Sequence, residues 1–470
     1  MTVTAPAEEI QEAPAAPRHP ARFVPWLLAA VFFAGYATLS VLRFRRFEMM
    51  SWDLGIFDQV VDSYAHLRAP VADLKGPGFN ILGDHFSPVL ALLAPFRALF
   101  PTPVTLLVAQ AALMALSVVP VTRAARRLLG DHAGVAIGIA YGLSWGIQRA
   151  VEFDFHEICF AVPLIAFALE ALLRERWVAA LCWAAPLVTV KEDLGVTASA
   201  IALVVLLRTW RGSRRVAVAA VCVGIFGVAM SALTLTVLIP AFNHAGDYAY
   251  WDKVDKGGTP GAGGWDVKIR TLFWVMVPTT GLLALRSPLL LVAVPTLAWR
   301  LLTQEEHYWG TGWHYSAVLM PIVMLALVDA AARARSGWLR ACAGHLPAGA
   351  LLVALSTTVM LPLPLEQLAR PERYERGPVA EAAVRALAKI PDGATVESNI
   401  RPIAYLTNRC RVFWVGDTGG HAPQYVALFE PDKQRDAILD DARSRHPGAA
   451  YDVEAYERGV WVLRRTFELS

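Results

Sequence analysis

The stretch Trp52-Asp53-Leu54-Gly55-Ile56-Phe57-Asp58-Gln59 lies just past the first long hydrophobic segment of the chain. It puts two carboxylates, Asp53 and Asp58, at the edge of a membrane span. A carboxylate beside a bilayer costs solvation energy unless it is paired, hydrated or used. A second acidic run, Phe153-Asp154-Phe155-His156-Glu157, lies at the edge of a later span. This placement predicts a site at the membrane surface.

Composition indicates an integral membrane protein. Of the 470 residues, 56% are hydrophobic, and the mean hydropathy is +0.43. The apolar residues gather in runs of about 16–25, the length that spans a hydrocarbon core of about 30 Å. The net charge of +3 is small and the basic residues fall in short loops, so nucleic acid is not an expected partner. The five cysteines form no C-x-x-C pair, so neither a disulfide framework nor a zinc site is suggested.

The apolar runs predict an all-α polytopic membrane bundle of about eleven transmembrane helices over residues 23–364. A further run, His85–Phe100, is interrupted by Pro88 and Pro95 and carries Arg97, so we expect an interfacial or re-entrant helix there. The expected spans are about Val24–Leu42, Thr102–Val121, His132–Ile147, Ile158–Leu173, Trp177–Val190, Leu194–Leu207, Val216–Pro240, Thr271–Leu285, Pro288–Leu302, Ser316–Ala332 and Pro347–Leu363.

Arginines follow every second span and orient the bundle by the positive-inside rule. The loops that carry them should be cytoplasmic, together with a disordered N-terminal tail over residues 1–22. The other loops are rich in acids, His, Trp and Tyr and should be extracytoplasmic. Arg43, Arg45 and Arg46 fall on that side against the rule, so they should pair with acids or meet an anionic ligand such as a lipid phosphate. We therefore expect a multi-pass protein of the inner (plasma) membrane.

The polar tail, residues 365–470, has a different pattern and predicts a small extracytoplasmic α/β domain. Helical periodicity covers Val379–Ile390 and Lys433–Arg445. Short strands are expected at Ala394–Glu397, Arg411–Val415 and Tyr425–Leu428, and a hairpin at Ala450–Tyr456 with Gly459–Arg464. Within the membrane part, Gly257–Gly264 is expected to be a flexible loop.

Asp53 and Asp58 can be interpreted in three ways. A carboxylate in a semi-enclosed site can act as a general base toward a hydroxyl, or it can bind a divalent cation through hard oxygen ligands. Alternatively, one of the two caps the next helix and the other is solvated.

Four further polar clusters fall on the same side of the bundle. Each has a structural alternative: a helix cap, an interfacial salt-bridge network or an aromatic membrane belt. Together, however, they would meet on one face, where aromatic rings can hold sugars and a lysine can meet a phosphate. The candidate binding residues are His85, Asp154, His156, Glu157, Lys191, Glu192, Glu306, His307, Trp313 and His314.

The runs W-D-L-G-I-F-D-Q, G-D-H-F-S-P, F-D-F-H-E, K-E-D and H-Y-W-G-T-G-W-H-Y resemble the bacterial DUF2079 family of predicted membrane proteins. The layout is also similar to that of the GT-C class of glycosyltransferases, which take sugars from polyprenyl-phosphate donors at the outer membrane face. In that class a long first outer loop begins with an acidic residue, often the catalytic base. The resemblance implies this role for Asp53 and an interfacial helix at His85–Phe100.

The leading hypothesis is therefore a membrane glycosyltransferase whose partners are a lipid-linked sugar donor, membrane lipid and an envelope acceptor. Asp53 would be the base and Asp58 a supporting acid or metal ligand. His85, His156 or Lys191 would neutralise the leaving phosphate. No cofactor is implied with certainty, and a divalent cation is a candidate. The alternatives are a transporter or flippase, and a non-catalytic envelope scaffold.

Overall fold

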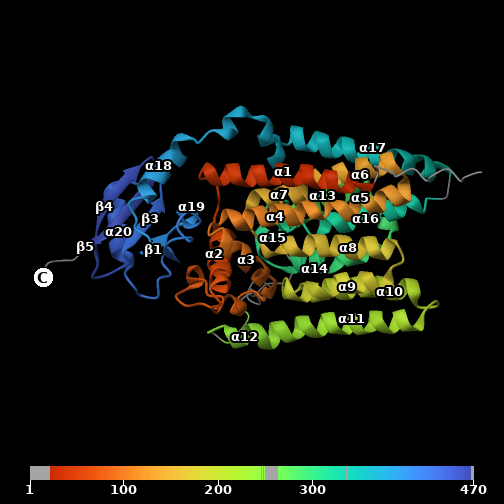
Figure 1. Ribbon diagram of the computed structural model, residues 1–470, viewed down its shortest axis with the longest axis horizontal. Coiled ribbons are helices and arrows are strands. Elements are labelled where there is room, and N and C mark those ends of the chain that lie inside the picture. Colours follow the sequence, from red (N-terminus) through yellow and green to blue (C-terminus); the bar gives the residue numbers. More distant parts are fainter. Residues whose placement is uncertain (1–21, 245, 247, 249–262, 335–336, 467–470) are drawn as a thin grey trace, which may run out of the picture.

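The computed structural model describes residues 22–244, 246, 248, 263–334 and 337–466. Nearly all of the N-terminal tail and most of the glycine loop Gly257–Gly264 lie outside these residues, so the two predictions made for them stay untested. The described chain forms a helical bundle with a small sheet domain at one end (Figure 1).

The bundle is built from helices that run along the long axis of the molecule (Figure 1). Its centre is α16, from Leu319 to Ala332, which is almost entirely buried. The other long-axis helices are α1 (Val24–Arg45), α4 (Val104–Leu116), α5 (Val118–Leu129), α6 (Asp131–Gly142), α7 (Trp145–Phe153), α8 (Ala161–Leu173), α9 (Trp177–Ala184), α10 (Leu194–Thr209), α11 (Arg214–Leu233), α13 (Trp265–Thr280), α14 (Val294–Leu302) and α17 (Gly337–Met360).

Four helical stretches in the described chain are long and apolar enough to cross a bilayer: Val24–Arg45, Val104–Leu129, Arg214–Phe242 and Ala343–Met360. Five shorter apolar helices accompany them, among them Leu194–Thr209 and Leu319–Ala332. The membrane bundle is thus confirmed as a fold, whereas the count of eleven crossings stays a prediction. Prolines shorten several segments, because a proline removes one backbone donor and interrupts the helix. Pro288 begins one 3-10 stretch, and Pro186 is the second residue of another, Ala185–Thr189.

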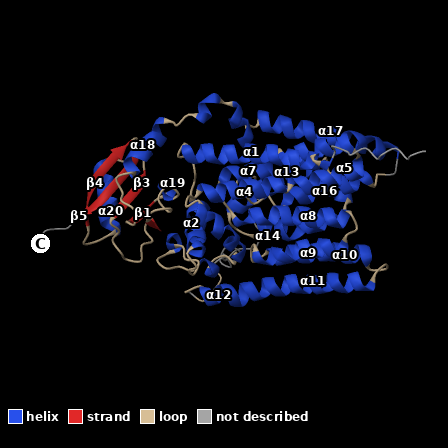
Figure 2. Cartoon of the chain, viewed as in Figure 1, coloured by secondary structure: helices blue, strands red, loops and turns tan. Residues whose placement is uncertain are grey.

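The C-terminal domain has one five-stranded sheet of order β2-β1-β3-β5-β4, shown as arrows in Figure 2. Its strands are β1 (Thr395–Ser398), β2 (Arg411–Trp414), β3 (Tyr425–Phe429), β4 (Ala450–Glu457) and β5 (Val460–Thr466), and its main helices are α18 (Pro378–Leu387) and α20 (Arg435–Arg445). β1 pairs in parallel with β2 and β3, whereas β4 and β5 form an antiparallel hairpin. The strand and helix predictions for the tail are confirmed to within a few residues.

Two short helices lie across the end of the bundle that faces this domain (Figure 1). One is α2 (Trp52–Ala65), which begins with the stretch Trp52–Gln59, and the other is α3 (Ala94–Leu99). The α3 segment exposes large apolar side chains, with Phe96 at 56% and Leu99 at 72%. Exposed apolar side chains of this kind are typical of a helix that rests in a membrane interface, and the interfacial helix expected over His85–Phe100 stays a prediction.

Candidate functional site

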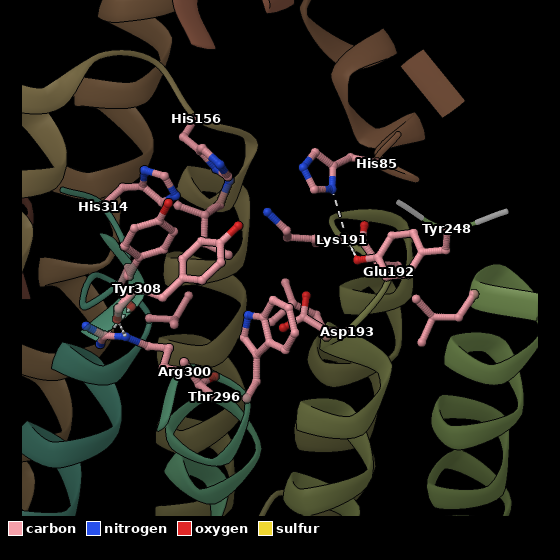
Figure 3. A pocket seen from close by; sticks show the side chains of 16 residues that line it. His85, His156, Lys191, Glu192, Asp193, Tyr248, Thr296, Arg300, Tyr308 and His314 are labelled. Atoms are coloured by element: carbon pink, nitrogen blue, oxygen red, sulfur yellow. Dashed lines mark hydrogen bonds and ion pairs between the residues drawn. The ribbon is translucent and has the colours of Figure 1, made fainter. Parts of the chain in front are cut away.

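A cavity that is partly open to solvent lies at the end of the bundle near α2, and the empty space in it, counted together with its open mouth, is about 820 Å³. Its polar side chains come from segments far apart in sequence, and Figure 3 shows them converging on one space; the five named next lie in loops and turns between helices. They include His85, His156, Lys191, Glu192 and His314. The clusters that the sequence placed on one face therefore meet around one cavity.

Asp53, His156 and His314 form a compact group at its edge. Their ligand atoms all lie within 4.8 Å of one another, and His156 Nε2 is 4.0 Å from Asp53 Oδ2. The two imidazoles stack with ring centroids 3.6 Å apart. The Asp53 side chain is 26% exposed, and burial raises its pKa, against the opposing effect of His156. A base of this kind titrates closer to neutrality than an ordinary aspartate.

His314 is a buried imidazole that lacks protein partners. It is 4% exposed, and neither ring nitrogen has a hydrogen-bond partner among the residues that the structure describes. Burial, followed by the nearby positive charges of His156 and Lys191, lowers the pKa of His314 well below its ordinary value. The ring is therefore neutral near pH 7, and it can accept a proton donor or bind a cation. Buried polar atoms without partners usually have a missing ligand or water.

A lysine and two glutamates supply the charge of the cavity. Lys191 Nζ lies 3.3 Å from Glu157 Oε1, and Glu157 Oε2 lies 3.0 Å from His156 Nδ1. The positive groups hold the pKa of Glu157 well below its usual range, although burial alone would raise it. The acids around Lys191, with Glu157 the strongest, raise its pKa against the effect of burial. Lys191 thus keeps its charge inside the cavity.

The opposite wall is organised around Glu192. Its Oε1 accepts hydrogen bonds from His85 Nδ1 and from the Tyr248 hydroxyl, each at 2.9 Å. His85 holds the pKa of Glu192 at about 2, although burial opposes this. Burial, and then the charge of Glu192, raises the pKa of the neighbouring Asp193 to about 6. This wall therefore carries one permanent carboxylate and one that titrates close to neutrality.

The sequence reasoning missed Arg300, which lies at the base of the cavity (Figure 3). Its guanidinium is 2% exposed and donates to the carbonyls of Tyr308 at 2.8 Å and Gly310 at 2.8 Å, and to Ser316 Oγ at 3.1 Å. It thereby holds the loop that carries His314. An arginine inside an apolar run was the available signal, because such residues are rare unless they are used.

Part of the cavity lining is apolar, and we call this part the apolar floor. It consists of Ile158, Leu194 and Val318, together with Leu235 from a π-helical segment, Thr234–Leu238, at the end of α11. π-helical turns often occur at functional sites. The cavity therefore combines charged side chains with an apolar floor.

Asp154 and Asp58 are among the expected carboxylates that do not line the cavity. Asp154 is fully buried and its Oδ2 accepts the backbone N–H of Leu54 at 3.1 Å, so it caps the start of α2. Asp58 is fully buried in an ion pair with Arg97, at 2.8 Å and 3.4 Å. Both Asp58 oxygens are engaged there, so the geometry gives it a structural partner instead of the supporting role expected from the sequence.

The three arginines expected to meet a lipid phosphate also lie away from the cavity. Arg43 Nη1 lies 3.6 Å from Glu152 Oε1, and Arg46 pairs with Glu48 at 3.0 Å. Of the two alternatives left open, these two arginines take the pairing with acids. Arg45 is exposed and lines a separate groove against α18.

The candidate binding residues of the aromatic loop, residues 306–314, differ in their burial and in their distance from the Asp53 group. Glu306 and His307 are exposed. Trp313 is half-buried with a left-handed backbone, φ 63°. Its ring meets Phe153 edge-on at 4.9 Å and lies 5.7 Å from the ring of Trp52, next to Asp53. This gives the Asp53 group an aromatic flank.

A divalent cation would fit the Asp53, His156 and His314 group. One carboxylate and two imidazoles suit a transition metal such as Zn²⁺ or Mn²⁺, and the unpartnered nitrogens of His314 are consistent with a ligand role. The three residues come from separate segments, so their spacing in the sequence carried no metal motif.

Comparison with solved structures identifies the fold. ArnT from Cupriavidus metallidurans bound to undecaprenyl phosphate matches with a TM-score of 0.60 and 13% sequence identity, over 94% of this chain and 98% of that one. The apo structure of the same protein matches with a TM-score of 0.54 and 13% identity, over 93% and 97%. The GT-C-like layout expected from the sequence is confirmed by this similarity.

Comparison of sequences adds the family. No curated protein matches the chain significantly. The model of the family described as "Predicted membrane protein (DUF2079)" matches residues 43–251 and 264–462, which is most of the chain. Every cavity residue named above falls within these two ranges. The chain therefore belongs to the DUF2079 family of predicted membrane proteins.

Proposed function

We propose that this protein is a membrane glycosyltransferase that transfers a sugar from a polyprenyl-phosphate donor to an envelope acceptor. The observation that carries the proposal is the convergence of Asp53, His156, His314 and Lys191 at one cavity with an apolar floor. It is supported by the similarity in fold to a protein solved with undecaprenyl phosphate. The cavity would open on the extracytoplasmic side of the inner membrane, and the N-terminus would be cytoplasmic.

The donor would lie with its phosphate among the charged side chains of the cavity and its first isoprene units on the apolar floor. Lys191 is the fixed positive charge available to a phosphate, because the surrounding acids keep it protonated. His85 would add a second donor from the opposite wall, since it faces Lys191 across the cavity (Figure 3). Leu235 and Ile158 would contact the lipid.

In the transfer step Asp53 would take the proton of an acceptor hydroxyl. The acceptor oxygen then forms the new bond to the anomeric carbon, while the bond from that carbon to the phosphate oxygen breaks. Polyprenyl phosphate leaves with the electron pair, and Lys191 stabilises its charge. A raised pKa suits Asp53 to this role, because a general base works best when its pKa lies nearer the working pH.

A divalent cation bound by Asp53, His156 and His314 would supply Lewis-acid stabilisation of the same phosphate. The low pKa of His314 would suit it to hold such a cation as a neutral imidazole.

The flippase alternative receives less support. Two acids lie within apolar helices of the described chain, Glu170 and Asp329, and both are engaged by arginines. Glu170 bonds Arg123 Nε at 2.9 Å, and Asp329 pairs with Arg208 at 3.0 Å and Arg333 at 2.9 Å. A substrate path would need polar groups that are available to the substrate.

The test is Asp53→Asn in purified full-length protein in lipid nanodiscs. The assay offers a panel of undecaprenyl-phosphate-linked sugars and measures released undecaprenyl phosphate. We expect a loss of at least about 100-fold in rate, the usual contribution of a positioned base. Asp62→Asn is the matched control, because Asp62 lies on the same helix but is engaged by Arg68 at the surface. Equal rates in the parent and Asp53→Asn would overturn the assignment.

A further inference from the structure

The helix that carries Asp53 is held from two sides. On the bundle side, Asp154 Oδ2 accepts the Leu54 N–H at 3.1 Å. On the other side, Ser51 Oγ accepts the backbone N–H of Ala404, in the C-terminal domain, at 3.3 Å. Both contacts are buried, and they bracket Asp53 in the sequence. The start of α2 is therefore fixed jointly by the membrane bundle and the C-terminal domain.

The C-terminal domain also approaches the backbone of α2 very closely. A Cβ atom at Gly55 would lie 2.2 Å from Ile403 Cγ2 and 2.9 Å from Leu74 Cδ1. Ile403 ends the short helix α19 (Ile400–Ile403) and is fully buried. Close packing of this kind leaves no room for an additional methyl group. Gly55 is thus required for the contact, two residues after Asp53.

Ser51 has a backbone conformation that needs support from its surroundings. Its φ of 55° and ψ of 13° lie in the left-handed region, which is unfavourable for residues with a Cβ atom. Such a conformation persists where neighbouring contacts over-determine it, and it is common at functional sites. Here the Ala404 N–H is one of those contacts, and Ser51 precedes Trp52 and Asp53 directly.

The rest of the domain interface prevents α19 from withdrawing. Gln59 Nε2 donates to the Val412 carbonyl at 2.8 Å, and Arg411 donates twice to Asp73, each time at 2.8 Å. The Tyr405 ring stacks on Phe44 with centroids 4.5 Å apart. All three contacts follow α19 in the sequence, and they hold the domain against α1, α2 and the segment around Asp73.

We propose that the C-terminal domain positions Asp53 through the Ser51–Ala404 hydrogen bond and the Gly55–Ile403 contact. The inference rests on the proposed function, because it specifies how the base is held against His156. Ile403 and Ala404 are positioning residues, and the domain is part of the transfer site. A separate binding module on a scaffold would not need this contact.

The test compares Gly55→Ala with Gly35→Ala in the full-length protein in nanodiscs. At Gly35, in α1, an added Cβ would meet its nearest atom at 3.7 Å, an ordinary contact. Alanine is the better helix former at both positions, so helix propensity cannot explain a loss. Ile403→Ala in the Gly55→Ala background removes the closest clash, at 2.2 Å from Ile403 Cγ2, and leaves a contact of 2.9 Å with the end of the Leu74 side chain.

The first measurement is amide hydrogen exchange of the segment 51–57, which needs no substrate. Overpacking should accelerate exchange at least about tenfold in Gly55→Ala. The double variant should return toward the parent, and Gly35→Ala should match it. If Gly55→Ala exchanges like Gly35→Ala, the C-terminal domain does not fix α2 and the proposal falls.

The second measurement is the transfer rate from an undecaprenyl-phosphate-linked sugar. Gly55→Ala should lower kcat at least about tenfold with little change in KM, because a displaced base affects the transition state more than donor binding. Ile403→Ala should restore kcat in that background. An unchanged kcat beside accelerated exchange would reduce the contact to a structural one and overturn the positioning role. If the parent shows no transfer, the proposed function fails, while rescued exchange still supports the coupling of the domain to α2.

Discussion

The Asp58–Arg97 ion pair allows a quantitative test of whether Asp58, in the motif Trp52–Gln59, stabilises the fold instead of taking part in the chemistry. Asp58 is 0% exposed and Arg97 is 2% exposed, with the shortest contact at 2.8 Å. Removing one partner of a buried pair leaves an uncompensated charge and costs about 3–5 kcal/mol. Asp62 Oδ1 also lies 3.5 Å from Arg97 Nη2, but this carboxylate is 29% exposed and partly screened. We therefore expect Asp58→Asn to destabilise the protein by about 3 kcal/mol, at the lower end of that range.

The assay is reversible unfolding of the full-length protein in mixed micelles, as a function of the denaturing detergent fraction. The double variant Asp58→Leu with Arg97→Met removes both charges and should lie within about 1 kcal/mol of the parent, since apolar replacement of a buried pair is often neutral. It should also retain transfer, because the pair does not line the cavity. A loss below about 1 kcal/mol in Asp58→Asn, or a double variant as unstable as the single one, would refute the reasoning.

Three further outcomes can be measured. Asp193→Asn should stabilise the protein near pH 7 by at most about 3 kcal/mol, because the pKa of Asp193 is raised from 3.8 to about 6 and each pKa unit corresponds to about 1.4 kcal/mol. Between pH 3.8 and about 6 the folded state of the parent binds more protons than its unfolded state, so the stability of the parent falls as pH rises through this range. The advantage of Asp193→Asn should therefore vanish below about pH 4. Thermal melts near pH 7 and below about pH 4 check this. Arg300→Lys should accelerate amide exchange in the loop 308–316, since lysine lacks the planar fork that bonds these carbonyls, and unchanged exchange would exclude this role. His314→Gln should weaken Zn²⁺ binding at least about tenfold by calorimetry, and equal affinity would remove His314 from the candidate cation site.

Hydropathy and charge alternation carry most of the information on the fold. Long apolar runs must become helices in a bilayer whatever their neighbours are, so the bundle followed from the sequence. The alternating pattern of the tail likewise predicted the hairpin of β4 and β5. What these patterns cannot give is the number of crossings, because prolines divide several runs into shorter helices and 3-10 stretches.

The sequence predicted which residues of the site lie near one another, but not which side chains pair with each other. His85, His156, Lys191 and His314 were expected on one face, and they line one cavity. The partner of Asp58, by contrast, depends on where α3 packs, and that is a property of the tertiary fold. Arg46 pairs with a close neighbour in sequence, Glu48, whereas Arg43 meets Glu152, whose proximity depends on the tertiary fold. The arginine at position 300 was visible in the sequence, yet its role depends on a loop that folds back on it.

The hydrogen bond between Ser51 and Ala404 also has a consequence for the order of events during synthesis. Ala404 follows Ser51 by 353 residues, and at about 5–20 residues per second this interval lasts roughly 18–70 s. During that time the membrane helices emerge while the first turn of α2 still lacks one of its two supports. The proposed transfer site would therefore be completed last, after the bundle has formed, and we expect a chain that stops before the C-terminal domain to be inserted but inactive.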